Sequence, residues 1–387
     1  MISNTNPRDC CGCTACENIC PHNAISMKPD ALGFLYPIID ADKCTGCNLC
    51  DKVCAFNNQY KKNDFEHTEV YAVRHKDIKE VENSRSGAMF IAITDYILNN
   101  GGVVYGVGYR DHFIVTHKRA TTKEERDEFR GSKYVQSELG CTFKSRRKDL
   151  KNGLAVCFSG TPCQTAGLRS FLERTRTDTS KLIVVDIVCH GVPSPYIWKD
   201  YLNHIEKKHN GKATAVSFRD KQELGWAAHK ESFVINGKKI ITDKYTTLFY
   251  KHIMFRHSCE ICHYTNTQRP SDITIADFWG WEKVDPHFNS DNKGVSLVLI
   301  NSTKGKELFN IIKDNIDSIK TEIGLTLQHN LQRPSIISPL RQKFEEEYKC
   351  EGVKYVLEKY SNLCKPNKIT EIIRKIRWNI THRILKR

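Results

Sequence analysis

The sequence predicts a small, cysteine-rich α+β module, followed by an α/β body with a mixed, partly parallel sheet and a helical C-terminal tail. Three observations predict this fold class. Two cysteine runs of identical spacing stand at the start of the chain, short runs of β-branched residues alternate with helical segments in the middle, and a basic segment with isoleucine at helical spacing ends it. A chain of 387 residues is long enough for two or three domains with cores of their own.

The compartment expected from the sequence is the cytoplasm. The first residues, MISNTNPRD, contain neither a basic region nor an apolar stretch, so no signal peptide is predicted. No apolar run approaches the roughly 20 residues that a membrane-spanning helix requires. In a reducing compartment, clustered cysteines bind metal more often than they form disulfides, and the 17 cysteines therefore need a metal as their explanation.

Two runs of four cysteines share the spacing C-x2-C-x2-C-x3-C. The first run is Cys10, Cys13, Cys16 and Cys20, followed by Pro21; the second is Cys44, Cys47, Cys50 and Cys54, followed by Ala55. This spacing is typical of bacterial two-cluster ferredoxins, in which the fourth cysteine of each run ligates the other cluster. The alternatives are zinc, which usually takes two C-x2-C knuckles, and disulfides.

Residues 1–60 are therefore expected to form a ferredoxin-like α+β module with two [4Fe–4S] clusters. The crossed pattern gives one cluster the ligands Cys10, Cys13, Cys16 and Cys54, and the other Cys44, Cys47, Cys50 and Cys20. Cys11 has no place in this scheme, because its neighbours already fill the register. Such a module carries single electrons, so the remainder of the chain is expected to supply or use them.

A polar linker over residues 60–68 leads into the α/β body. Strands are expected at 70–75, 101–109, 154–160, 181–189, 272–280 and 295–301, and helices at 88–100, 164–173, 196–209 and 305–316. Alternation of strands with helices is typical of an α/β body with a partly parallel sheet.

Four further cysteines stand where the predicted strands end. Cys163 follows a strand in FSGTPCQ, Cys189 ends one in DIVCHG, and Cys259 and Cys262 form the C-x2-C of SCEICHY. Turns after strands are where α/β proteins assemble sites, so these cysteines can converge on one metal. The alternative is separate, buried, inert cysteines with a zinc knuckle at 259–262.

Six segments together resemble the coenzyme F420 hydrogenase/dehydrogenase beta-subunit family, in particular members with an N-terminal two-cluster module. They are ENSRSGAMFIAI, RGSKYVQSELG, FSGTPCQTAGLRSFL, DIVCHGVPSP, SFRDKQELGW and SDITIADFWG. The resemblance implies FAD beside a third [4Fe–4S] cluster on Cys163, Cys189, Cys259 and Cys262. It further implies a flavin-binding region over 69–150 and a region with flavin and the third cluster over 151–335.

Three segments within this resemblance supply candidate flavin contacts. The candidates are Ser84, Ser86 and Gly87, then Ser132, Lys133, Tyr134 and Ser137, and finally Gly160, Thr161 and Pro162. Serine hydroxyls and a glycine before a helix suit a pyrophosphate, although an ordinary serine N-cap is the commoner cause of S-x-S-G. Arg85 and Ala88 depart from the serine run and paired glycines usual in the family. Lys133 can offer its charge to a phosphate, and a surface turn is the alternative for its segment.

No catalytic residue is predicted. His190 follows Cys189 and suits either a proton relay or a capped turn. Trp279 and Trp281 flank the end of a strand, where tryptophan belongs to the core more often than to a flavin site.

The formal net charge of +14 raises nucleic acid as a partner class, although none is expected. Residues 336–387 are expected to form a helical basic tail that ends in NKITEIIRKIRWNITHRILKR. Its isoleucines share one face, which either contacts an anionic membrane surface peripherally or packs on the body or a partner.

The sequence thus predicts an iron–sulfur flavoprotein oxidoreductase that passes electrons between a hydride carrier, F420-like or other, and a one-electron acceptor or substrate. The expected cofactors are FAD, two [4Fe–4S] clusters in the N-terminal module and a third in the body. The expected partners are the carrier and a redox protein, either a ferredoxin or a catalytic subunit. Alternatives are a non-catalytic electron-transfer subunit docked on a separate enzyme and, as a minor one, a nucleic-acid-binding cluster protein.

Overall fold

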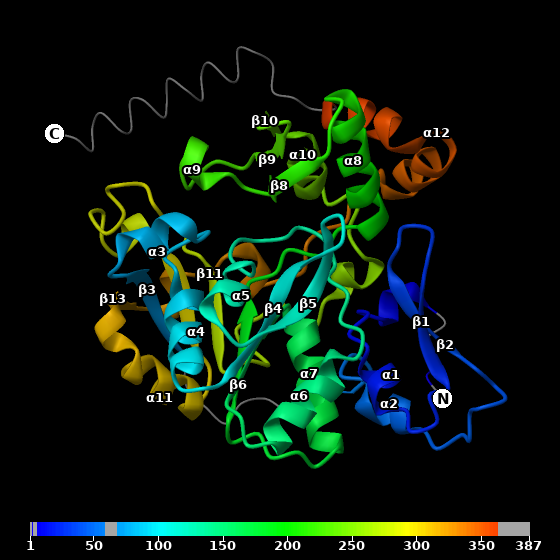
Figure 1. Cartoon of the computed structure of the whole chain (residues 1–387), viewed down its shortest axis with the longest axis horizontal. Helices are drawn as coiled ribbons and strands as arrows, with labels where there is room; N and C mark the ends of the chain where they lie inside the picture. The colour runs from blue at the N-terminus through cyan, green and yellow to red at the C-terminus, as the bar shows by residue number, and fades with distance from the viewer. Residues whose placement is uncertain (1, 3–5, 59–67, 363–387) are drawn as a thin grey trace.

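The computed structural model describes residue 2, residues 6–58 and residues 68–362. An N-terminal module, an α/β body with an eight-stranded sheet, and a three-stranded sheet with its own helices lie side by side (Figure 1). This architecture confirms the predicted fold class. The basic segment 367–387 lies outside the described residues, and no helix within them is long and apolar enough to cross a membrane.

The N-terminal module is a small α+β unit. Its elements are η1 (Pro7–Asp9), α1 (Ala15–Ile19), β1 (Ile25–Pro29), β2 (Leu35–Ile39) and α2 (Leu49–Val53). The strands β1 and β2 form an antiparallel hairpin, and the Asp30 carboxylate closes its turn by accepting from the N–H groups of Leu32 and Phe34. Each short helix carries the third cysteine of its run and ends directly before the fourth.

The body is built on a mixed sheet in the order β13-β3-β12-β11-β7-β6-β4-β5. The strands are β3 (Glu69–His75), β4 (Val103–Arg110), β5 (Ile114–Ala120), β6 (Val156–Gly160), β7 (Leu182–Ile187), β11 (Ile273–Asp277), β12 (Ser296–Ile300) and β13 (Ile316–Thr321). The central pairs β4–β6, β6–β7 and β7–β11 are parallel, and the others are antiparallel. Six strands lie where the sequence predicts them. The unpredicted β5 and β13 are the edge strands, where polar residues interrupt the apolar pattern.

Helices cover both faces of this sheet, because alternate residues of its strands point to opposite sides. The helices of the body are α3 (Ile78–Asn83), α4 (Met89–Asn99), α5 (Lys123–Asp127), α6 (Thr142–Lys151), α7 (Pro162–Arg174) and α11 (Thr303–Ile311). One face packs against α4 and α11 in a core that includes Val104 and Cys157. On the other face, Val156 and Phe158 pack with α6, α7 and the N-terminal module. The module is therefore part of the core of the body, beside α7.

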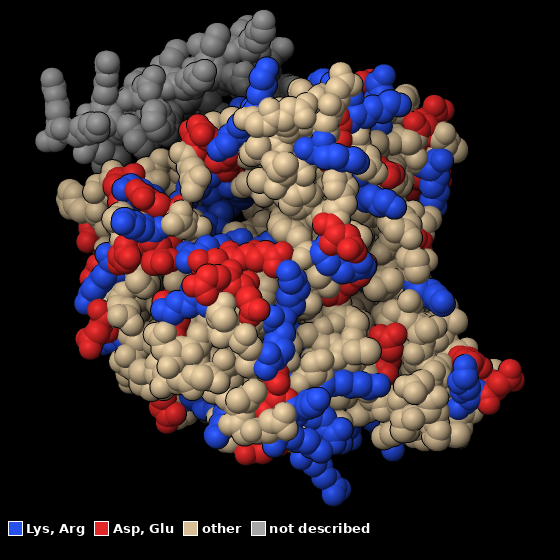
Figure 2. All heavy atoms as spheres, in the orientation of Figure 1, with Lys and Arg blue, Asp and Glu red and all other residues tan. Residues whose placement is uncertain are grey.

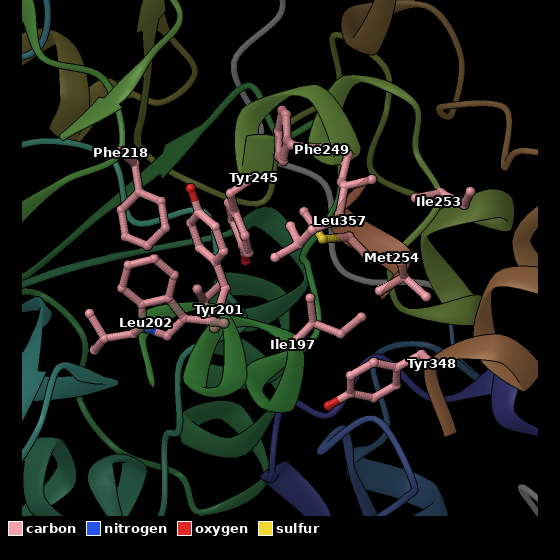
Figure 3. Packing of buried hydrophobic residues seen from close by; sticks show 14 of the residues in the cluster. Ile197, Tyr201, Leu202, Phe218, Tyr245, Phe249, Ile253, Met254, Tyr348 and Leu357 are labelled. Atoms are coloured by element: carbon pink, nitrogen blue, oxygen red, sulfur yellow. The ribbon is translucent and has the colours of Figure 1, made fainter. Parts of the chain in front are cut away.

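A second, smaller sheet was not predicted from the sequence. It consists of β8 (Ala213–Ser217), β9 (Glu231–Ile235) and β10 (Lys238–Thr242), all antiparallel, with α8 (Pro195–Lys208), α9 (Lys221–Leu224), α10 (Lys244–Tyr250) and α12 (Arg341–Asn362). Figure 3 shows side chains of α8, α10 and α12, such as Tyr201, Tyr245 and Leu357, gathered in one core. Residues 341–362 are helical, as predicted for the start of the tail.

Charged side chains of both signs are interspersed on the surface shown in Figure 2. On this face, the described residues therefore present mixed charge rather than one continuous basic surface.

Candidate functional site

Four cysteines of the N-terminal module form a first group, which joins the two runs. Burial raises the pKa of the Cys16 thiol, and the nearby thiols of Cys13, Cys10 and Cys54 raise it further. Burial likewise raises the pKa of Cys54 to about 11, with Cys13 adding to the effect. Cys54, the fourth cysteine of the second run, thus lies near the first three cysteines of the first run.

The other four cysteines of the runs are called the second group below, and they are partly or fully exposed. Cys47 is exposed, and Cys20, Cys44 and Cys50 are half-buried. The helices α1 and α2 pack against each other, and this contact brings the residue after α1, Cys20, toward the second run.

The body supplies a third group at the ends of its strands. Burial raises the pKa of the Cys189 thiol, and the thiols of Cys259, Cys163 and Cys262 each raise it further. The backbone N–H of Val192 donates to Cys259 Sγ over 3.4 Å, which connects the loop after Cys189 to the C-x2-C segment. The structure therefore brings together the four cysteines that the sequence places far apart.

Cys11, which has no place in the spacing scheme, lies between the first and third groups. Its thiol is buried, and hydrogen bonds to Cys13 and then to Cys163 are the main causes of its strongly raised pKa. The first and third groups are thus separated by a single thiol. No sequence signal marks this position, because the contact partner Cys163 is 152 residues away.

The chemistry of these thiols fits iron–sulfur clusters. Hydrogen bonds from Cys11 lower the pKa values of Cys13 and Cys163, whereas burial raises the pKa values of Cys16, Cys54 and Cys189. A bound metal favours the thiolate form of all of them. Among residues 6–58 and 68–362, no three His, Cys, Asp or Glu converge tightly enough for a single metal ion. A cuboidal cluster holds its four thiolates farther apart, because each thiolate binds a different iron.

A pocket of about 340 Å³, the central pocket below, adjoins the third cysteine group. Cys189 lines it, and the Thr161 hydroxyl at its wall lies 3.2 Å from Cys163 Sγ. The pocket opens at the carboxyl ends of β6, β7 and β11, the edge at which parallel sheets bind ligands. Its volume is within the usual range for cofactor and ligand sites.

Eight of the ten candidate flavin contacts line this pocket. They are Ser84, Ser86, Ser132, Lys133, Tyr134, Ser137, Gly160 and Thr161. The two others have structural roles. A Cβ at Gly87 would lie 2.1 Å from the Val73 carbonyl oxygen, so glycine is needed there for backbone packing. Pro162 occupies the first turn of α7, where its missing N–H costs nothing.

Several of the pocket residues already have hydrogen-bond partners. The Lys133 amine donates to the carbonyl oxygens of Glu128 and Arg130, at 2.7 and 3.0 Å, and burial lowers its pKa to about 7. The Ser86 hydroxyl donates to the Val295 carbonyl, and Ser137 Oγ accepts from Gln164. These contacts hold the pocket walls in place.

Two arginines and an aspartate in the pocket were missed at the sequence level. Arg219 Nη1 lies 2.6 Å from Asp277 Oδ2, and Arg85 Nη2 donates to the Trp226 carbonyl over 2.6 Å. Arg85 is nine-tenths buried, and within the described residues its Nη1 has no hydrogen-bond partner. The sequence marked Arg85 only as a departure from the family pattern, since a lone arginine carries no spacing signal.

The expectation that Trp279 belongs to the core is wrong. Its side chain is 36% exposed, lines the pocket and stacks on Trp226 with ring centroids 4.6 Å apart. The strand β11 ends at Asp277, so Trp279 falls in the turn beyond the sheet. His190 also lines the pocket, and burial lowers its pKa to about 4.

Two family models match the chain. Residues 154–322 match the model for the C terminus of the beta subunit of coenzyme F420 hydrogenase/dehydrogenase, and residues 9–58 match the 4Fe-4S dicluster domain. Among solved structures, a chain of the F420-reducing [NiFe] hydrogenase complex from Methanosarcina barkeri aligns at 17% identity and a TM-score of 0.47, covering 76% of this chain and 94% of that one. No curated protein matches the chain. The chain is therefore an iron–sulfur protein in which a 4Fe–4S dicluster domain precedes a segment that is similar to the C terminus of the coenzyme F420 hydrogenase/dehydrogenase beta subunit.

Proposed function

We propose that the chain is an oxidoreductase that passes electrons between a hydride carrier, F420-like or other, and a one-electron acceptor. It would hold FAD in the central pocket and [4Fe–4S] clusters on the three cysteine groups. The observation that carries this proposal is Cys189, which lines the pocket and also belongs to the third cysteine group. FAD, when bound, supplies the exchange between a two-electron hydride and single electrons.

The pocket suits the anionic part of FAD. Arg85 presents a buried nitrogen without a partner in the described residues, and such a group favours an anionic ligand. The N-terminus of the 11-residue helix α4 also faces the pocket through Ala88 and Met89. Free N–H groups at a helix N-terminus attract phosphate, so a pyrophosphate at this end has both a charge and a dipole to bind it.

The three cysteine groups suit a chain of clusters that runs from the pocket to the surface. The third group adjoins the pocket, Cys11 connects it to the first group, and the second group ends at the exposed Cys47. Cys10 and Cys13 of the first group are buried and the third group is half-buried, whereas exposure at Cys47 gives a redox partner protein access.

The same exposure supports a second candidate function, a non-catalytic electron-transfer subunit that docks on a separate enzyme through the surface near Cys47. Turnover of a hydride carrier by the isolated chain distinguishes the two functions, because a pure relay has no site for the carrier.

The flavin proposal is tested by flavin affinity. The wild-type chain is expected to bind about one FAD, and Arg85→Gln is expected to weaken FAD binding about 10- to 100-fold, since a hydrogen bond to a charged group contributes about 1.5–3 kcal/mol. Riboflavin, which lacks phosphate, should bind both proteins equally. Affinities come from flavin fluorescence quenching, with the exposed Lys151→Gln in α6 as the control. If Arg85→Gln weakens the binding of FAD and of riboflavin equally, or weakens neither, Arg85 does not contact the phosphates.

A further inference from the structure

Within the described part of the chain, Arg256 is a buried cation without a paired carboxylate. Its side chain is fully buried, just before η2 (His257–Ile261) in the segment that leads to Cys259. Its guanidinium donates to the carbonyl oxygens of Cys10 and Leu35 over 2.7 and 2.9 Å and to Gln136 Oε1 over 2.9 Å. It also stacks on the Tyr36 ring at 4.1 Å.

A buried guanidinium destabilises the folded chain unless a negatively charged group lies nearby. Removing a guanidinium from water costs several kcal/mol when no counter-charge is present. Two other buried arginines of the described residues have that counter-charge: Arg126 pairs with Asp95, and Arg269 pairs with Asp186 at 3.0 Å. A third, Arg146, has no ion pair with a carboxylate within the described residues and instead stacks on the rings of Tyr105 and Phe158. The hydrogen bonds of Arg256 satisfy its N–H groups. The three oxygens that accept them are neutral, so they do not balance the positive charge of the guanidinium.

The groups near Arg256 that can carry negative charge are cysteines, which do so as thiolates. Its Nη2 lies 3.5 Å from Cys10 Sγ, which belongs to the first cysteine group. The thiols of Cys11 and Cys259 lie close enough to interact electrostatically with the guanidinium, and the Arg256 carbonyl accepts from the Cys259 N–H over 3.0 Å. Arg256 thus stands between the first group and the third group.

The N-terminal module leaves space for this side chain. A Cβ at Gly12, where φ is +70°, would lie 2.8 Å from Arg256 Nη1. The residue between Cys11 and Cys13 therefore has to be small, and the guanidinium fills the space beside the loop that carries the ligands.

We propose that Arg256 sets the reduction potential of the first cluster, as the fixed positive charge that stabilises its reduced form. The proposal rests on the function proposed above. Four thiolates give a [4Fe–4S] cluster a negative net charge, and reduction adds another electron to it. Burial alone disfavours that added charge, so a buried cluster without a cation would resist reduction. Arg256 opposes this effect and keeps the first cluster able to accept an electron from the third.

The test is potentiometric titration of the anaerobically purified full chain, followed by the EPR signals of the reduced clusters. Arg256→Gln is expected to make the potential of the first cluster more negative by at least 59 mV, the equivalent of a tenfold change for one electron. Arg256→Lys, which keeps the charge, should lie closer to wild type. Arg126→Gln is the matched control, because it removes a buried arginine that pairs with a carboxylate away from the cysteines.

A second variant keeps the test decisive if Arg256→Gln fails to fold. Gln136→Glu puts a carboxylate at the atom that accepts from Arg256 Nη1, so it neutralises the cation without removing the side chain. It should also make the potential of the first cluster more negative. Intact clusters with unchanged potentials in either variant overturn the role of Arg256 and leave the proposed function standing. A wild-type chain that assembles no clusters overturns both.

Discussion

Replacing Cys163 with alanine is expected to remove the third cluster from the full chain. Three four-iron clusters correspond to about 12 iron atoms per chain, and the loss of one leaves about 8. Cys163 interacts with Cys189, Cys259 and Cys262 in one half-buried group, so a missing thiolate would leave one iron of the proposed cluster without its ligand. Iron and sulfide quantitation after anaerobic purification measures the effect, and the absorbance of the proposed flavin should shift as well, since Cys189 lines the pocket proposed for FAD.

The matched control is Cys157→Ala. Cys157 is a fully buried thiol in β6 that points to the opposite face of the sheet, toward α4. This variant should keep all its iron and sulfide. Unchanged iron in Cys163→Ala, or zinc in place of iron in the wild-type body, would show that the third group holds no iron–sulfur cluster.

The variant Gly167→Ala is expected to disrupt the first cluster without removing any ligand. Gly167 lies in α7, and a Cβ there would come within 2.7 Å of Cys13 Sγ and 2.9 Å of Cys13 Cβ. A thiolate that is bonded to iron cannot move away, and α7 is fixed by its packing on the sheet. Iron should therefore fall from about 12 to about 8 atoms per chain, with loss of one reduced EPR signal.

The control for this substitution is Gly324→Ala, since a Cβ at Gly324 has no neighbour within 4 Å among the described residues. It should keep wild-type iron content and stability. A Gly167→Ala protein with its full iron content would mean that the first cluster does not hold Cys13 against α7.

Much of the fold could be predicted because its signals are local. The cysteine runs have fixed spacing, and the central strands are apolar on both faces because helices cover both, so each stands out along the chain. The β8–β10 sheet was missed because its strands are short, and ATAVS and KKIIT mix polar and apolar residues without the regular alternation that marks a strand. Their apolar partners come from α8, α10 and α12, and only the folded chain brings these together.

In the candidate site, too, local sequence signals could be identified, whereas contacts between distant segments could not. The cysteine positions could be identified one by one, whereas the place of Cys11 between two groups depends on contacts across more than a hundred residues. Arg85, Arg219 and Asp277 come from three distant segments, and each alone resembles a surface charge. Only the tertiary structure buries these three side chains and pairs them, and so identifies them as part of the pocket.

The proposed order of electron passage is tested most directly by mixing the FAD-loaded chain anaerobically with a reduced deazaflavin as the hydride donor. Flavin absorbance and freeze-quench EPR are then followed in wild type and in Cys163→Ala. In wild type, the flavin should bleach first, and the reduced signals of the N-terminal clusters should follow. In Cys163→Ala, the flavin should still bleach while those clusters stay oxidised, because the third cluster between them is gone. Cluster signals that appear equally fast in both proteins, or in a chain without flavin, would contradict this order.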